Sequence, residues 1–309
     1  MKKISIVTPT YNEAGNVREI YRQVKEIFSK LPEYKYEHLF IDNASKDQTV
    51  EILKEIAAND NNIKIIVNTR NFGHIRSGYY GFLKTTGDAV ITLVADLQDP
   101  PTMIIDFIRK WKEGYKIVVG VKKKSQESRL MFVVRNLFYR LIGTLSEVEQ
   151  VRGFTGFGLY DKRVVEILKQ IDDPYPYFRG LITDLGFEIA KVEYFQPKRW
   201  HGRTKNNFYT LYDLAMLGIT NHSKIPLRLA TMLGFLISIL SILTAFGYLI
   251  YKLVFWNNFN VGIAPLVIGF FFFASVQLFF IGILGEYIGS IHTQVLKRPL
   301  VIEKERINF

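Results

Sequence analysis

Short apolar runs alternate with amphipathic stretches along roughly the first two thirds of the chain. The apolar runs predict strands, and apolar positions spaced three and four residues apart predict helices. The predicted strands are 4–8, 36–42, 63–67, a run that starts at 91, 115–121 and 187–195. The predicted helices are a stretch ending near 30, 48–59, 74–86, 102–112, 162–170 and 176–186. Strands that alternate with helices are typical of a doubly wound, mostly parallel α/β sheet.

Two stretches, 229–250 and 261–288, are almost wholly apolar. Each is long enough to cross a hydrocarbon core of roughly 30 Å, and the short connector 252–260 makes them a hairpin. Basic residues flank the pair outside the hairpin, whereas the connector holds only Lys252. The positive-inside rule therefore places both termini in the cytoplasm of a multi-pass protein of the inner (plasma) membrane.

These patterns divide the chain into four parts. We expect a cytosolic α/β domain at 1–200, an interfacial amphipathic region at 201–227, two transmembrane helices within 228–290 and a cytosolic tail at 291–309. The helix expected at 206–222 has an apolar side and precedes a span, which favours a position in the membrane interface. The basic stretch 122–140 fits a solvated helix face and a helix on anionic lipid equally well. The glycine-rich stretch 152–161 predicts a turn into an edge strand.

The charge and the missing motifs narrow the function. The net charge of +11 suits nucleic acid, anionic lipid or a phosphorylated substrate. Because the basic residues gather toward the apolar hairpin, no nucleic-acid partner is expected. No glycine-rich phosphate loop follows the first strand, which argues against an NAD enzyme and a P-loop NTPase. With no cysteine, thiolate chemistry and disulfides are excluded.

Polar residues follow four of the predicted strands. Because the carboxyl ends of parallel strands meet at one edge of a sheet, these residues predict a ligand crevice there. Asp96 and Gln98 offer oxygen ligands for Mg²⁺ or Mn²⁺, which usually also binds substrate phosphates. Asp99 precedes Pro100 and fits a helix cap as well as a ligand. The strand-end residues are Thr8, Tyr11, Glu13, Asp42, Asn43, Arg70, Asn71, Asp96 and Gln98.

An ordered set of motifs resembles the family 2, A-type (GT-A) glycosyltransferases, and among them the polyprenyl-phosphate glycosyltransferases, which include the dolichol-phosphate mannosyltransferases and the bactoprenol glucosyltransferases. The resemblance covers nearly the whole chain. The motifs are Val7-Thr8-Pro9-Thr10-Tyr11-Asn12-Glu13, Ile41-Asp42-Asn43-Ala44-Ser45-Lys46-Asp47, Asn71-Phe72-Gly73, Ala95-Asp96-Leu97-Gln98-Asp99-Pro100-Pro101, Gly202-Arg203-Thr204-Lys205 and Gly285-Glu286-Tyr287-Ile288-Gly289.

The resemblance implies a GT-A fold for 1–200 and roles for single residues. It assigns Asp96 and Gln98 to the metal and the donor diphosphate. Val94 stands where many relatives carry the first Asp of Asp-x-Asp, which puts metal dependence in question unless Asp99 compensates. It assigns the nucleotide to Thr8, Pro9, Tyr11, Glu13, Asp42 and Asn71.

The implied reaction is inverting transfer of a sugar from a nucleotide sugar to polyprenyl phosphate. UDP-glucose and undecaprenyl phosphate are the expected substrates; mannose, N-acetylglucosamine, aminoarabinose and a guanosine donor stay open. A phosphate monoester has a second pKa near 6, so the acceptor needs no strong base, and Asp161 fits a helix N-cap better than a base. Besides Asp96, the expected catalytic residues are those that neutralise the lipid phosphate: Arg129, Arg135, Arg203 and Lys205.

Other functions remain open. The segment Gln196-Pro197-Lys198-Arg199-Trp200 matches the Q-x-x-R-W of processive polysaccharide synthases, although a two-helix hairpin is too small for a polymer channel. A membrane protein that binds nucleotide sugar or lipid phosphate without catalysis, or that moves lipid across the bilayer, is the rival of another class. Small residues in the second span, such as Gly269 and Gly282, would allow a homo-oligomer.

Overall fold

The computed structural model describes residues 1–123, 151–197, 208–255 and 263–309. Its strands are β1 (Lys2–Thr10), β2 (Tyr34–Asp42), β3 (Ile63–Asn68), β4 (Ala89–Thr92), β5 (Ile117–Lys122), β6 (Phe154–Asp161), β7 (Ile189–Tyr194) and β8 (Glu303–Ile307). Its helices are α1 (Val17–Ser29), α2 (Thr49–Asn59), α3 (His74–Leu83), α4 (Met103–Lys112), α6 (Lys162–Gln170), α7 (Phe178–Asp184), α8 (Phe208–His222), α9 (Ile225–Val254) and α10 (Ile263–Leu296).

The strands form one eight-stranded sheet in the order β7-β5-β6-β4-β1-β2-β3-β8. Strand β1 pairs in parallel with β2 and β4, β2 with β3, and β5 with β7. The pairs β4–β6, β5–β6 and β3–β8 are antiparallel. The expected mostly parallel, doubly wound α/β sheet is therefore confirmed.

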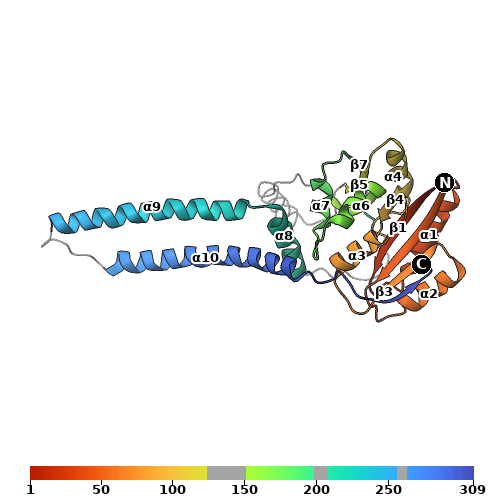
Figure 1. The fold of residues 1–309 in the computed structure, drawn as a ribbon, viewed down its shortest axis with the longest axis horizontal. Coiled ribbons are helices and arrows are strands. Elements are labelled where there is room, and N and C mark those ends of the chain that lie inside the picture. The colour runs from red at the N-terminus through yellow and green to blue at the C-terminus, as the bar shows by residue number, and fades with distance from the viewer. Residues whose placement is uncertain (124–150, 198–207, 256–262) are drawn as a thin grey trace.

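Successive residues of the central strands face two separate cores. Ile4 and Ile6 of β1 are buried among residues of α1, α2 and α4, whereas Val7 is buried with residues of α3, α6 and α7. Side chains alternate across a strand, so an apolar run that is buried on both faces needs helices on both sides. Figure 1 shows these two helical layers around the sheet.

Two features of the sheet differ from the sequence-based expectation. Strand β6 was expected at an edge, but it lies between β5 and β4, so that prediction is wrong. Gly158 of β6 allows its backbone to approach that of β5, since a Cβ at this position would lie 2.4 Å from the carbonyl oxygen of Val118. No strand was expected after 291, yet β8 covers the β3 edge of the sheet. Asn308 secures it by donating to the carbonyl oxygens of Ala57 and Ile63 at 2.8 and 2.9 Å.

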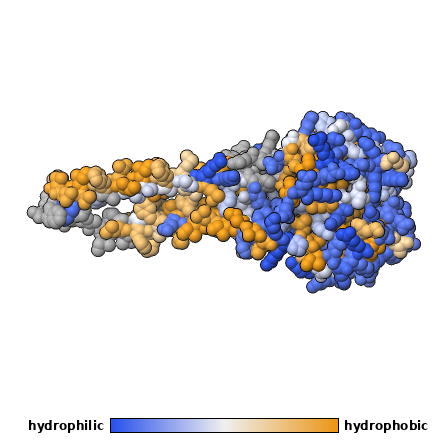
Figure 2. All heavy atoms as spheres, in the orientation of Figure 1, coloured by the Kyte–Doolittle hydropathy of each residue, from blue (hydrophilic) through white to orange (hydrophobic). Residues whose placement is uncertain are grey.

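Helices α9 and α10 extend away from the α/β domain as a hairpin (Figure 1). The segments Ile225–Val254 and Ile268–Leu296 are long and apolar enough to cross a membrane, and none of the residues in their apolar windows is buried within the protein. Figure 2 shows apolar side chains over most of the hairpin, in contrast to the polar surface of the α/β domain. The two long apolar helices expected from the sequence are thus present, and α8 lies where an amphipathic helix was expected.

Candidate active site

The loops after β1 and β2 are joined by reciprocal hydrogen bonds. The backbone N–H of Asn12 donates to Ser45 Oγ, and the N–H of Lys46 donates to Asn12 Oδ1, both at 2.8 Å. Asn12 and Ala44 have φ of 55° and 60°, a backbone region that favours short turns over strand or helix. Both loops therefore leave the carboxyl edge of the sheet as one unit.

Asp42 stands at the end of β2 and is fully buried. Its carboxylate accepts from Thr10 Oγ1 at 3.1 Å and from the N–H of Ser45 at 2.8 Å, and also from Ser45 Oγ. Burial raises the pKa of Asp42 because it disfavours the charged form, while the Ser45 bonds oppose that rise. In this structure Asp42 organises the two loops, and its contact with a nucleotide stays a prediction.

The other residues assigned to the nucleotide differ in accessibility. Thr8 is fully buried, and its Oγ1 lies 2.9 Å from Nε2 of His38. Pro9, Tyr11 and Glu13 are half-buried beside the loop pair. These three side chains, rather than Thr8, are therefore placed to meet a ligand at the carboxyl edge.

Asn43 connects the loop after β2 with the loop after β3. Its Nδ2 donates to Asn71 Oδ1 at 2.9 Å, and its Oδ1 accepts from the N–H of Phe72 at 2.9 Å and from Asn68 Nδ2 at 3.1 Å. Asn71 Oδ1 also accepts from the N–H of Gly73 at 2.8 Å. Asn71 thus shapes its own loop, which is exposed at this residue.

Replacing Asn43 with alanine should raise the KM for the expected nucleotide-sugar substrate about tenfold. It should also destabilise the domain by about 1–3 kcal/mol, because the amide groups that bond to Asn43 lose their hydrogen-bond partner. Steady-state kinetics and chemical denaturation measure the two effects. Asn59→Ala, on the exposed end of α2, is the matched control, since its Nδ2 donates to the carbonyl oxygen of Glu55 in the same helix. Equal effects of the two substitutions on the donor KM would contradict the role of Asn43.

The acidic loop follows β4, which ends at Thr92, so residues 93–101 lie outside the strand. Asp96 is 8 % exposed, and its Oδ1 accepts from the N–H of Gln98 at 3.1 Å. Leu97 between them has φ of 58°, which turns the loop sharply. The half-buried Gln98 and the carboxylate of Asp96 belong to one tight turn beyond the strand.

Asp99 bonds to a tyrosine and is not the N-cap of α4, the role considered above. Its Oδ1 accepts from the Tyr194 hydroxyl at 2.7 Å, and the N-cap of α4 is Thr102. Burial raises the pKa of Asp99 to about 6, with the charge of Asp96 adding to the rise, while Tyr194 and Lys122 oppose it. Tyr194 ends β7, the strand at one edge of the sheet, and was not singled out in the sequence, because a tyrosine at the end of a predicted strand carries no chemical signal.

The donor set fits Mg²⁺ or Mn²⁺ bound together with a diphosphate. Among the described residues no three His, Cys, Asp or Glu side chains cluster as a metal site. Magnesium commonly uses one or two carboxylates and takes its other ligands from substrate phosphates and water. Asp96 with the amide oxygen of Gln98 meets that requirement, whereas the side chain of Val94 is 40 % exposed and offers no ligand.

Comparison with known proteins identifies the family. The sequence profile described as Glycosyl transferase family 2 matches residues 5–168. The chain belongs to this family. It is 37 % identical to an uncharacterized glycosyltransferase, YkcC, of Bacillus subtilis (96 % of this chain, 92 % of that one). It is 35 % identical to the bactoprenol glucosyl transferase of Shigella phage SfII (98 % of each chain).

Among solved structures, the family 2 glycosyltransferase described here is similar to glucosyl-3-phosphoglycerate synthase from Mycobacterium tuberculosis. The TM-score is 0.49 at 20 % identity, over 71 % of this chain and 78 % of that one.

Of the remaining residues considered for the site of this glycosyltransferase, Asp161 lies in the described part of the chain and the basic residues lie outside it. Asp161 lies opposite Ala89, at the amino end of β4, and caps α6 by accepting from the N–H of Arg163 at 3.0 Å. The N-cap expected at Asp161 is confirmed. The basic residues expected to contact the lipid phosphate, together with the processive-synthase motif beyond Pro197, lie outside the described residues: Arg129, Arg135, Arg203 and Lys205.

Proposed function

We propose that this glycosyltransferase moves glucose from UDP-glucose to undecaprenyl phosphate, with inversion at the anomeric carbon, at the cytoplasmic face of the plasma membrane. The observation that carries the proposal is the attachment of the carboxyl-edge site to two long apolar helices. Relatives named bactoprenol glucosyl transferase match almost the full length of the chain, hairpin included, which supports a lipid-linked acceptor.

The proposed donor site is the carboxyl edge of β1, β2 and β4. Pro9, Tyr11 and Glu13 line the place of the nucleoside, beside the loop pair that Asp42 holds together. Asp96 and Gln98 hold Mg²⁺ or Mn²⁺, which when bound offsets the negative charge that builds up on the leaving diphosphate. The backbone bond from Gln98 to Asp96 keeps one carboxylate oxygen oriented before the donor arrives.

The proposed acceptor supplies its own nucleophile. A phosphate monoester is already an anion near pH 7, so an in-line attack on the anomeric carbon needs no strong general base. The chain must instead bring two anions together, and we assign that task to Arg129, Arg135, Arg203 and Lys205. Asp161 takes no part, since it caps a helix at the opposite edge of the sheet.

The proposed topology places both termini in the cytoplasm. Strand β8 near the C-terminus and strand β1 near the N-terminus belong to the same sheet, so one α/β domain lies beyond the same end of the hairpin (Figure 1). The positive-inside pattern of the sequence supports the cytoplasm as the side on which that domain lies.

The test is an assay with purified protein, radiolabelled UDP-glucose, undecaprenyl phosphate and Mg²⁺ or Mn²⁺. We expect label to enter the lipid phase as a β-linked product, opposite in anomeric configuration to the α-linked donor. Removal of metal with excess EDTA should lower the rate at least about a hundredfold, and readdition of Mn²⁺ should restore it. Tight UDP-glucose binding without label in lipid, for this or any other donor sugar, would favour a non-catalytic binding protein or a lipid translocator.

A further inference from the structure

The α/β domain meets the membrane hairpin through the segment between α6 and α7. Gln294 of α10 donates to Asp173 Oδ1 at 2.8 Å, and Lys297 pairs with Asp172 at 2.9 Å. Tyr177 packs against α8, where a Cβ added to Gly218 would lie 3.3 Å from the Tyr177 ring. This segment and the helices beside it therefore lie between the sheet and the membrane helices, as Figure 1 shows for α3, α7 and α8.

Two half-buried arginines lie in this layer, each against a tyrosine of the segment. The Arg76 guanidinium of α3 is 5.4 Å from the centre of the Tyr175 ring, and that of Arg179 is 5.3 Å from Tyr177. Both belong to one packed unit, because the ring of Phe178 contacts α3 at Tyr79 and Phe82. Burial and the nearby charge of Arg179 both lower the pKa of His74, in the first turn of α3.

Within the described parts of the chain, neither arginine pairs with a carboxylate. Nε of Arg76 is buried and has no hydrogen-bond partner there, and Arg179 makes one long bond of 3.5 Å to the carbonyl oxygen of Phe154. A cation that has lost part of its hydration without gaining an anion is costly. Of the two arginines, Arg76 would therefore be stabilised more by an anionic ligand.

The position of Arg76 defines which anion can reach it. Two residues further along α3, Gly78 packs against Pro9, because a Cβ there would lie 3.3 Å from Pro9 Cγ. Pro9 belongs to the proposed donor site, whereas Tyr175 lines a cavity of about 280 Å³ between α8 and α10. Arg76 therefore lies between the proposed donor site and the layer that contacts α8 and α10.

We propose that Arg76 binds the phosphate monoester of the lipid acceptor, with Arg179 adding positive charge to the same approach. The inference rests on the proposed function and adds residues that no motif of the sequence indicated. A guanidinium presents several N–H donors in a plane and matches phosphate oxygens in pairs. The Tyr175 ring lies beside this group, 5.4 Å from it. Arg76 is a binding residue for the acceptor, separate from the groups that hold the donor.

The test is a pair of KM measurements on Arg76→Gln, Arg76→Lys and Arg179→Gln in the full chain. We expect Arg76→Gln to raise the KM for undecaprenyl phosphate at least about tenfold and to leave the KM for UDP-glucose within about twofold. Arg76→Lys should lie between, because lysine keeps the charge without the fork, and Arg179→Gln should change the acceptor KM about threefold. Arg109→Gln, exposed on α4 at the other face of the sheet, is the matched control.

Several outcomes would overturn the inference. An unchanged acceptor KM in Arg76→Gln does so, as does an equal change in both KM values with a lower unfolding temperature, which indicates a structural role. Binding of farnesyl phosphate tests the contact without catalysis, so failure of wild-type transfer would count against the proposed function alone. If Arg76→Gln weakens binding to phosphatidylglycerol vesicles but not to farnesyl phosphate, Arg76 serves bulk anionic lipid and the inference is wrong.

Discussion

We expect Asp96→Asn to lower the rate of sugar transfer about a thousandfold. The substitution keeps the size of the side chain and an oxygen that can accept from the N–H of Gln98, but removes the negative charge that a divalent cation needs. Losing most of the cation's stabilisation of the leaving diphosphate raises the barrier by about 4 kcal/mol, which is a factor of about a thousand. The measurement is kcat at saturating metal and donor, with Mn²⁺ affinity followed by electron paramagnetic resonance.

Two further variants make this result specific. Asp106→Asn removes an exposed carboxylate on α4 that pairs with Arg109, and it should leave both the rate and the Mn²⁺ affinity unchanged. Asp99→Asn keeps an acceptor for the Tyr194 hydroxyl and should cost less than Asp96→Asn. A full rate in Asp96→Asn together with a loss of activity in Asp99→Asn would move the metal to Asp99 and contradict the assignment.

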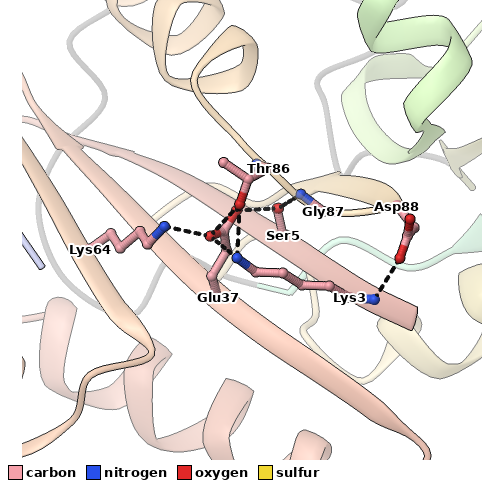
Figure 3. Close-up of polar contacts among 7 residues, drawn as sticks. All are labelled: Lys3, Ser5, Glu37, Lys64, Thr86, Gly87 and Asp88. Carbon is pink, nitrogen blue, oxygen red and sulfur yellow. Dashed lines mark hydrogen bonds and ion pairs between the residues drawn. The ribbon is translucent and has the colours of Figure 1, made fainter. Parts of the chain in front are cut away.

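Glu37→Ala should lower the free energy of unfolding by about 3–5 kcal/mol, because it leaves the ammonium groups of Lys3 and Lys64 without the buried carboxylate that pairs with them. The Glu37 carboxylate is 3 % exposed and pairs with Lys3 at 2.6 Å and with Lys64 at 2.9 Å. It also accepts from Ser5 Oγ at 2.6 Å and from the N–H of Thr86 at 2.8 Å. Figure 3 shows how these bonds join the amino ends of β1, β2 and β3 and the segment before β4.

Urea denaturation followed by tryptophan fluorescence measures the effect of Glu37→Ala. The control is Glu33→Ala, just before β2, whose 49 % exposed carboxylate reaches Lys112 at 3.3 Å. An exposed pair of this kind contributes less than about 1 kcal/mol. A loss below 1 kcal/mol in Glu37→Ala would show that the network at the amino ends does not stabilise the sheet.

The same carboxylate predicts a pH dependence. Burial alone would raise the pKa of Glu37, but bonds from Lys3, Ser5 and Lys64 outweigh it and lower the pKa from 4.5 to about 2. A carboxyl whose pKa is lower in the folded protein stabilises it above the unfolded pKa. The contribution of Glu37 should therefore be complete above about pH 4.5 and decline as the pH falls from 4.5 toward 2. In Glu37→Gln the unfolding free energy should depend less steeply on pH in this window.

Much of the fold could be read from local sequence. Strands 36–42 and 63–67 and helices 48–59 and 102–112 appear within about two residues of their predicted bounds, because the spacing of apolar residues reports the secondary structure directly. The apolar hairpin was equally readable, since length and composition alone decide it. The sequence also placed Asp96 and Gln98 in one loop beyond a strand, where the structure has them.

Strand pairing and side-chain contacts between distant segments needed the tertiary structure. The central position of β6 and the addition of β8 depend on which backbones can approach, and β8 joins a strand more than two hundred residues earlier. The bond between Asp99 and Tyr194 joins residues 95 positions apart. It gives Asp99 a partner other than the cap its neighbourhood suggested.

The chemical type of this protein was therefore determined by its sequence, and the arrangement of its charges by the fold. The ordered motifs that resemble the family 2 glycosyltransferases, the acidic loop after a strand and the apolar hairpin are all local patterns, so they could be read without any three-dimensional information. Arg76 carries no such pattern, because its proposed role rests on its place on α3 beside the ring of Tyr175. Burial and the lack of a paired anion are properties of packing, and only the folded chain decides them.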